Sequence, residues 1–267
     1  MNICVCMKQV PDTNEIKVDP ETHTLIRKGV PSIVNPFDTY AQEVGVRLKE
    51  KLGGKLIVIS MGPEQAKEAL KSTLAVGADG AYLISSRSFG GSDTLATSYI
   101  LSQAIKCIEE KEGLKFDLIL CGKQATDGDT AQVGPEIAEH LDLPQITYAL
   151  DILDEDGEIK VKREFDAGYD MISTKLPAVV TVVKLPYEPR YPTIKSKMAA
   201  KKKEIPVLTE ADLPSIDLAC CGLNGSPTRV KKTFTPTREK NGVKLTGMEP
   251  ADAAKEVVKL LDEAKLL

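Results

Sequence analysis

The sequence contains no tryptophan, and aromatic residues make up 4% of its 267 positions. Proteins that bind single-stranded nucleic acid without sequence preference stack the bases on aromatic side chains, so this composition argues against that class. An excess of positive charge is also missing, because 35 Lys and Arg stand against 39 Asp and Glu and leave a formal net charge of −4. A polyanion therefore meets no global attraction, and we expect no nucleic-acid partner.

Long hydrophobic runs are missing as well. No segment approaches the roughly 18 consecutive apolar residues of a membrane-spanning helix, so we expect no membrane span. Residues 1–8 read as a buried strand and do not have the layout of a signal peptide, which predicts a cytoplasmic location. The two histidines, His23 and His140, lack metal-ligand spacing, and we expect no metal site. Six cysteines lie mostly in apolar segments, as reduced core thiols do.

Over the first 150 residues, short apolar runs alternate with helical patterns. The runs that predict strands lie at residues 2–8, 55–60, 81–84 and 116–121. Apolar residues at helical spacing separate them. Alternating strands and helices require right-handed crossovers, so the sequence predicts an α/β fold with a doubly wound, mostly parallel sheet.

A helix start is expected at Asn35, with its side chain as the N-cap and Pro36 in the first turn. The helix is expected to run to about Lys51. Later in the chain, strands that extend or cap the sheet are predicted at residues 145–152, 158–163, 171–174 and 178–183, with a turn at 154–157.

From Lys184 onward the composition shifts to prolines and lysines, and we expect little compact core there. The last segment, residues 249–267, has the spacing of an amphipathic helix. We therefore divide the chain into an α/β nucleotide-binding domain over residues 1–185 and a C-terminal extended arm over residues 186–267.

The most informative stretch is residues 121–135, directly after a predicted strand. Ligands of open α/β sheets bind beyond the carboxyl ends of the strands, and a loop that leads into a helix N-terminus offers backbone N–H groups to an anion. A nucleotide phosphate fits this arrangement. The alternative is an ordinary capped turn with Asp129 or Thr130 as N-cap. The carboxylates of Asp127 and Asp129 suit hydroxyl or amide partners better than phosphate.

A second candidate loop, residues 85–94, also follows a strand. Gly90 and Gly91 let a backbone approach a ligand closely, and the three polar residues after them offer caps and hydrogen bonds. An ordinary flexible loop is the alternative. Because the turns at residues 6–11 and 60–63 lie at the same edge of the predicted sheet, the four turns together indicate a nucleotide site.

Catalytic constellations are otherwise absent from the sequence. Cys220 and Cys221 are adjacent; reduced thiols in a poorly structured arm and a strained disulfide are the two interpretations. The basic residues 195–203 read as a solvated loop or, with their interleaved apolar residues, as a protein-docking loop. Redox or transfer chemistry would have to come from a bound cofactor.

Several motifs follow one another along the chain: VCMKQV (5–10), VNPF (34–37), SMGP (60–63), GAD (77–79), GKQA (122–125), KRE (162–164), KLPAVVT (175–181), EPRY (188–191) and KKK (201–203). In this order they resemble electron-transfer flavoprotein beta subunits over nearly the whole chain. The resemblance implies a Rossmann-like core and an arm that wraps an alpha subunit.

Two branches of that family differ in the ligand of the beta subunit. In one, the beta site is a structural AMP pocket; in the electron-bifurcating branch it holds an FAD that takes hydride from NADH. Gly128, Ala131 and Val133 resemble the bifurcating form, in which less polar bulk leaves room for a larger ligand.

By this resemblance, the following residues bind the cofactor: Cys6, Asn35, Ser60, Met61, Asp93, Thr94, Thr97, Gly122, Gln124, Ala125, Asp127, Gly128, Asp129, Thr130, Ala131, Gln132 and Val133. Asp93, Thr94 and Thr97 are expected at the flavin end. Gly90, Gly91 and Ser92 are expected to face NADH, and Ile194 and Met198 to contact an acyl-CoA dehydrogenase.

The implied function is a redox subunit of an NADH-dependent flavoprotein complex. FAD and NADH are the expected cofactor and donor, with AMP as the alternative ligand. The expected partners are an alpha subunit, an acyl-CoA dehydrogenase, and ferredoxin or flavodoxin. An unrelated ATP-binding stress-type domain is a further possibility, which would retain ATP without an alpha subunit.

Overall fold

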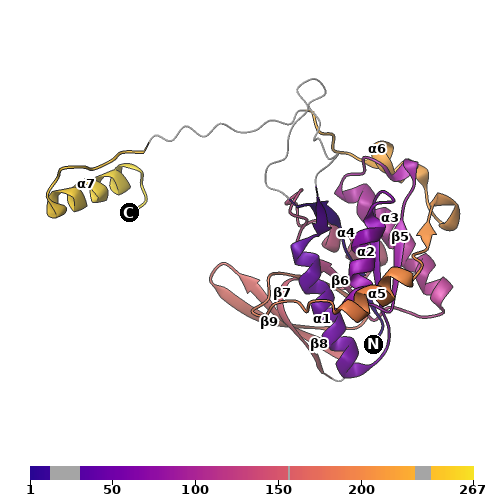
Figure 1. The fold of residues 1–267 in the computed structure, drawn as a ribbon. Coiled ribbons are helices and arrows are strands. Elements are labelled where there is room, and N and C mark those ends of the chain that lie inside the picture. The colour runs from indigo at the N-terminus through magenta and orange to yellow at the C-terminus, as the bar shows by residue number, and fades with distance from the viewer. Residues whose placement is uncertain (13–30, 156, 232–241) are drawn as a thin grey trace.

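A computed structural model describes residues 1–12, 31–155, 157–231 and 242–267 (Figure 1). Within these ranges the centre is a nine-stranded sheet with the order β11-β5-β4-β1-β6-β10-β7-β8-β9. Its parallel strands are β1 (Ile3–Cys6), β4 (Leu56–Met61), β5 (Gly80–Ile84), β6 (Leu118–Gly122), β7 (Gln145–Glu155), β10 (Ala178–Val182) and β11 (Val207–Leu208). The strands at residues 2–8, 55–60, 81–84 and 116–121 are confirmed, with ends moved by at most two residues.

Helices cover both faces of this sheet. One apolar layer packs β1 and β4 against α1 (Pro36–Leu52) and α2 (Ala66–Ala75). The opposite layer packs the same strands against α3 (Thr94–Glu112) and α4 (Val133–Leu141). Successive strand residues alternate between the two layers and are apolar on both sides, as burial of a parallel sheet requires. The predicted α/β, Rossmann-like, doubly wound fold is thereby confirmed.

Beyond β7 the sheet becomes antiparallel. β7 pairs with β8 (Glu158–Phe165), and β8 pairs with β9 (Gly168–Lys175). The prediction that these segments extend the sheet is confirmed; β7, β8 and β9 are longer than their apolar patterns suggested, and β10 ends one residue earlier. Residue 156 of the predicted turn lies outside the described residues.

The C-terminal segment contributes more to the core than its composition suggests. β11 pairs in parallel with β5 at the sheet edge, and Leu208, Leu213 and Cys221 are buried. The expectation that little compact core follows Lys184 was therefore wrong for this stretch. The buried apolar residues of this stretch are few and are separated by polar ones, so the sequence shows no periodic pattern from which a strand or helix could be predicted.

Residues 194–202 form helix α5 (Ile194–Lys202) against α2, so the interpretation of the basic run as a loop was also wrong. The segment just before it is held to α1 by Arg190, whose Nε lies 2.9 Å from Glu43 Oε2 and whose Nη1 lies 2.6 Å from Glu50 Oε1.

The chain ends in the expected helix, α7 (Pro250–Glu263), which Figure 1 shows away from the α/β body. No residue of α7 is buried, and its apolar side chains Val257 and Val258 are exposed. The predicted division into a domain over residues 1–185 and an arm over residues 186–267 stays a prediction. Within the described ranges, no helix combines the length and apolar character needed to cross a membrane.

Candidate functional site

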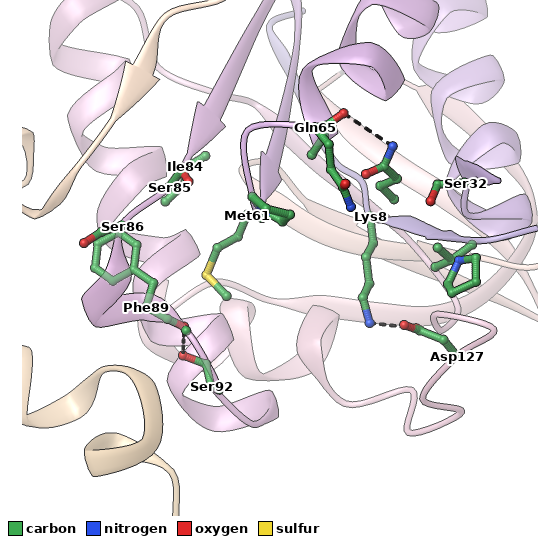
Figure 2. A pocket seen from close by; sticks show the side chains of 18 residues that line it. Lys8, Ser32, Met61, Gln65, Ile84, Ser85, Ser86, Phe89, Ser92 and Asp127 are labelled. Carbon is green, nitrogen blue, oxygen red and sulfur yellow. Dashed lines mark hydrogen bonds and ion pairs between the residues drawn. The ribbon is translucent and has the colours of Figure 1, made fainter. Parts of the chain in front are cut away.

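A cavity of about 370 Å³ opens at the carboxyl ends of β1, β4 and β5 (Figure 2). Its lining comes from five stretches of chain, which lie at or after the ends of β1, β4, β5 and β6 or at the start of β3 (Ser32–Val34): Lys8, Gln9, Val10, Pro11, Ser32, Met61, Gly62, Pro63, Gln65, Ala66, Ile84, Ser85, Ser86, Phe89, Gly90, Gly91, Ser92 and Asp127. Strand order reverses at β1, between β4 and β6, and ligands of doubly wound sheets bind at such a switch point.

Lys8 and Asp127 form one wall of the cavity. Figure 2 shows the Lys8 side chain reaching toward Asp127, and the Nζ–Oδ1 distance is 2.7 Å. The Asp127 side chain is only 10% exposed, whereas that of Lys8 is 49% exposed. Lys8 is the one Lys or Arg among the described residues that line the cavity. The cation is therefore available to an anionic ligand that displaces or joins Asp127.

Asp38, in the first turn of α1, joins the two strands at the switch point. Its Oδ2 accepts from the backbone N–H of Lys8 at 2.7 Å, and its Oδ1 accepts from the N–H of Gly122 at 3.1 Å. Burial raises the pKa of Asp38 to about 7, although these two N–H groups and the amide of Asn35 oppose the rise. This carboxyl thus fixes the ends of β1 and β6 relative to each other.

Asn35 does not cap α1 with its side chain, contrary to the sequence prediction. Its Nδ2 donates to the carbonyl of Gln124 at 2.7 Å, and its Oδ1 accepts from the N–H of Thr126 at 3.1 Å. The residue is completely buried. Asn35 therefore holds the segment between β6 and α4, residues 123–132, which we call the β6–α4 loop.

The β6–α4 loop has an unusual backbone. Asp129 and Ala131 adopt left-handed conformations, with φ of 52° and 53°, and Asp129 Oδ1 accepts from Gln124 Nε2 at 2.7 Å. The amide partner expected for Asp129 is thus found within the loop. Helix α4 starts at Val133, after Gln132, and has no side-chain cap; the prediction of Asp129 or Thr130 as N-cap was wrong.

This backbone geometry leaves several N–H groups free to bind a ligand. The backbone N–H groups of residues 130–134 have no hydrogen-bond partner among the residues that the structure describes. Alternating left- and right-handed residues before a helix N-terminus form a concave set of N–H groups that favours anions. A phosphate is the chemistry that this loop can accept.

The second wall is the segment between β5 and α3, residues 85–93, which we call the β5–α3 loop. Asp93 is the N-cap of α3, with Oδ1 accepting from the N–H of Ala96 at 3.1 Å. Its Oδ2 accepts from the N–H and hydroxyl of Thr228 at 3.0 and 2.8 Å. Burial acts to raise the pKa of Asp93, but the hydrogen bonds from Thr228, Ala96 and Ser226 outweigh it and leave the pKa below its ordinary value.

Thr94, at the start of α3, lies between the two loops. Its hydroxyl is 3.2 Å from Gln132 Oε1 and 3.2 Å from Glu136 Oε1. The N–H of Thr97 donates to the carbonyl of Asp93 and continues the first turn of α3. Ser60, one residue before Met61, is buried with an Oγ that has no partner among the described residues.

Buried thiols lie beneath this edge of the sheet. Contact with Cys121 lowers the pKa of Cys6, but the contact with Cys4 and burial raise it well above the ordinary value overall. Contact with Cys6 and burial likewise raise the pKa of Cys121. Both thiols therefore stay protonated at neutral pH.

The predicted site residues fall into two sets. Met61, Asp127, Gly90, Gly91 and Ser92 line the cavity itself. The others surround it in the β6–α4 loop, in the first turn of α3 or beneath the strand ends: Cys6, Asn35, Ser60, Asp93, Thr94, Thr97, Gly122, Gln124, Ala125, Gly128, Asp129, Thr130, Ala131, Gln132 and Val133.

Sequence reasoning placed the turn at residues 6–11 at this edge of the sheet but did not name Lys8 among the cofactor-binding residues. Gln65 and Ala66 start α2 without an N-capping side chain, so they gave no motif. Elsewhere, Ile194 and Met198 lie one turn apart on α5, 82% and 60% exposed. No cluster of three or more His, Cys, Asp or Glu suited to a metal occurs among the described residues.

Cys221 does not lie in a poorly structured segment, contrary to the expectation. It is buried against the β5–α3 side of the core, with Sγ 3.3 Å from the carbonyl of Asp217, while Cys220 is an exposed free thiol.

A doubly wound sheet with a cavity and a loop of open N–H groups at its switch point is the arrangement in which α/β proteins bind nucleotides. Residues 22–213 match the model of the family described as "Electron transfer flavoprotein domain". The chain belongs to the electron transfer flavoprotein family, and several of its relatives are named as beta subunits.

Three relatives illustrate this. The chain is 53% identical over 247 residues to "Electron transfer flavoprotein subunit beta" of Megasphaera elsdenii, covering 92% of this chain and 91% of the relative. It is 45% identical over 268 residues to "Caffeyl-CoA reductase-Etf complex subunit CarD" of Acetobacterium woodii, covering 100% of both. "Protein FixA" of Azorhizobium caulinodans is 41% identical over 259 residues, covering 95% and 92%.

Proposed function

We propose that this beta subunit binds FAD at the switch-point cavity and takes part in flavin-based electron bifurcation. In this proposal the complex accepts hydride from NADH and passes electrons to the alpha-subunit flavin and an acyl-CoA dehydrogenase on one path, and to ferredoxin or flavodoxin on the other. A cytoplasmic location is part of the proposal.

The observation that carries it is the open set of N–H groups at residues 130–134, beside a cavity with one lysine. A dinucleotide needs donors for its phosphates and a separate space for its rings. The β6–α4 loop supplies the first through backbone, since Ala131 and Val133 have no polar side chain. The cavity, with Met61 and Phe89, supplies the second.

Bound FAD would supply the hydride and single-electron chemistry. The residues of this chain would bind and orient it: Lys8 by charge, the β6–α4 loop by N–H donation, and Ser60 by its buried hydroxyl, which has no partner among the described residues. Asn35 and Asp38 hold these groups in place through the contacts described above. No side chain needs to act as an acid or a base.

The second candidate is a beta subunit that holds structural AMP and no flavin of its own. The volume of about 370 Å³ favours it, because ligand pockets range over about 300–1,000 Å³ and this one lies at the small end. The two candidates share the phosphate donors and differ in the occupant of the cavity.

Counting released nucleotides separates the candidates. The full chain is produced together with its alpha subunit, the complex is denatured, and FAD and AMP are quantified per heterodimer. Two FAD and no AMP support the bifurcating proposal, whereas one FAD with one AMP contradicts it. NADH added to the intact complex should bleach the flavin absorbance under the first outcome.

A matched pair of variants assigns the site. Asp129 and Asp142 are both exposed and both left-handed, with φ of 52° and 54°, but Asp142 lies at the far end of α4. Asp129→Trp is expected to remove one nucleotide per heterodimer, and Asp142→Trp to retain it. Retention in both variants contradicts the site assignment.

A further inference from the structure

The C-terminal segment folds back onto the cavity wall before it leaves the α/β body. Residues 221–228, which we call the arm clasp, include the short helix α6 (Gly222–Gly225) and lie against the β5–α3 loop. More than 120 residues of chain separate the two segments. Their contacts are therefore a tertiary feature rather than a local turn.

Two serines make the first set of contacts. The N–H of Gly222 donates to Ser92 Oγ at 3.0 Å, and Ser92 Oγ donates to the carbonyl of Phe89 at 2.8 Å. The N–H of Asp93 donates to Ser226 Oγ at 2.8 Å, and Ser226 Oγ donates to the carbonyl of Gly222. Ser226 is buried.

Thr228 makes the second set. Its N–H and its hydroxyl both donate to Asp93 Oδ2, while Asp93 Oδ1 caps α3. Hydrogen bonds to a carboxylate are about twice as strong as those between neutral groups. The hydrogen bonds of Thr228 also keep Asp93 ionised, which agrees with its lowered pKa.

The fit between the two segments is close. A Cβ on Gly222, whose φ is +58°, would overlap the carbonyl oxygen of Ser88. A Cβ on Gly91, whose φ is +77°, would come within 2.7 Å of a Leu223 methyl group. Each segment therefore needs a glycine where it faces the other.

We propose that the arm clasp positions the β5–α3 loop, and with it the outer wall of the nucleotide cavity, and that Ser226 and Thr228 are the positioning residues. The inference deepens the proposed function, on which its ligand-binding consequence rests. Gly90, Gly91 and Ser92 line the cavity. The clasp makes hydrogen bonds with Ser92 and Asp93 at one end of that stretch, and Gly222 packs closely against Ser88 before it.

The test uses the full chain co-produced with its alpha subunit. Thr228→Val keeps the shape of the side chain and removes the hydroxyl donor, Thr228→Ser restores it, and Ser226→Ala is a second, independent change. Val230→Ala is the control, because Val230 is exposed two residues farther along the arm. Backbone hydrogen exchange of residues 88–97, and the Kd values of FAD and of AMP, are measured for each variant.

Thr228→Val and Ser226→Ala are expected to speed exchange in residues 88–97 about ten-fold, as loss of a charged or buried hydrogen bond implies. The Kd of the nucleotide that the wild type binds should rise by about the same factor, and KM for NADH should rise more than kcat falls. Thr228→Ser and Val230→Ala should match the wild type.

Unchanged exchange in both Thr228→Val and Ser226→Ala overturns the positioning role, as does faster exchange with an unchanged Kd. If the wild-type complex binds neither FAD nor AMP, the proposed function fails. The exchange rates then still decide whether the clasp positions the loop.

Discussion

The two loops that flank the candidate site are held in opposite ways. Asn35 holds the β6–α4 loop through two side-chain hydrogen bonds, and Asp38 fixes the end of β6 before it. The loop's own N–H groups at residues 130–132 have no hydrogen-bond partner among the described residues. The β5–α3 loop is held by the arm clasp, because the side chains of Ser92 and Asp93 accept hydrogen bonds from Gly222 and Thr228.

This difference separates binding from positioning. A loop with free N–H groups can bind the phosphate of a ligand, because no existing hydrogen bond within the protein has to break for it. A loop with occupied donors shapes the cavity but contributes mainly backbone and van der Waals surface. The position of Asp93 and Thr94 therefore supports a wall-forming role, while the β6–α4 loop supports the phosphate role.

The largest expected difference between the loops is their response to pH. The pKa of Asp38 is raised from 3.8 to about 7, so the folded state binds its proton more tightly than the unfolded state. The stabilising contribution of Asp38 to the free energy of unfolding is fully present below about pH 4. It is lost as pH rises toward about 7, and the total loss is at most about 4 kcal/mol. Urea unfolding at successive pH values should show this decline, and Asp38→Asn should flatten it.

Asp93 is expected to have the opposite effect on how stability depends on pH. Its lowered pKa means that its contribution is present above about pH 4 and is lost as pH falls below that value. Asp93→Asn should flatten the acid side of the profile and leave the neutral side unchanged. Identical profiles for both variants would show that neither carboxyl behaves as its contacts imply.

The next effect concerns the glycine at the end of β6. A Cβ on Gly122 would overlap Asp38 Oδ1 and Phe37, whereas a Cβ on Gly128 meets nothing within 4 Å. Gly122→Ala is expected to lower the free energy of unfolding by about 3 kcal/mol, and Gly128→Ala to change it little. Chemical denaturation measures both, and equal effects would refute the close approach of α1 to β6.

A smaller effect is expected at Asn35. Asn35→Ala leaves the carbonyl of Gln124 and the N–H of Thr126 without their partners, which should cost about 2 kcal/mol. Hydrogen exchange should increase in residues 124–132 and stay unchanged in residues 88–93. Faster exchange in both loops would mean that they are not held independently.

The smallest effect on stability is expected at Lys8. Its ion pair with Asp127 is partly exposed, so Lys8→Met should change the free energy of unfolding by less than about 1 kcal/mol. Lys55→Met, which removes a surface ion pair with Glu112, is the control. Lys8→Met alone should weaken binding of the phosphate-bearing nucleotide, about ten-fold in Kd by titration; equal Kd values in both variants would exclude a ligand role for Lys8.

The parallel strands and their helices could be predicted because each is a continuous apolar run or a periodic pattern. Met61, Asp127 and Gly90–Ser92, which the motifs singled out, lie together at the cavity edge because residues after parallel strands share one edge of the sheet. Helix α5 and strand β11 could not be predicted: lysines dominate the first, and the second has two residues.

The role of Asn35 shows why local rules mislead here. Asn before Pro at a helix start matches the N-cap pattern, but its side chain turns to the β6–α4 loop about 90 residues away. Thr228 has no local signal at all, and its partner Asp93 lies 135 residues earlier. Side-chain partners at such distances depend on how the layers pack.

The sequence by itself determined which segments are strands and helices, their alternation, the glycines and polar residues at the strand ends, and the family. Only the tertiary structure decided which of those polar groups remain open and which are consumed by Asn35, Asp38 and the arm clasp. The physical reason is that burial and periodicity are properties of neighbouring residues. Hydrogen-bond satisfaction, in contrast, depends on groups that the fold brings together from distant parts of the chain.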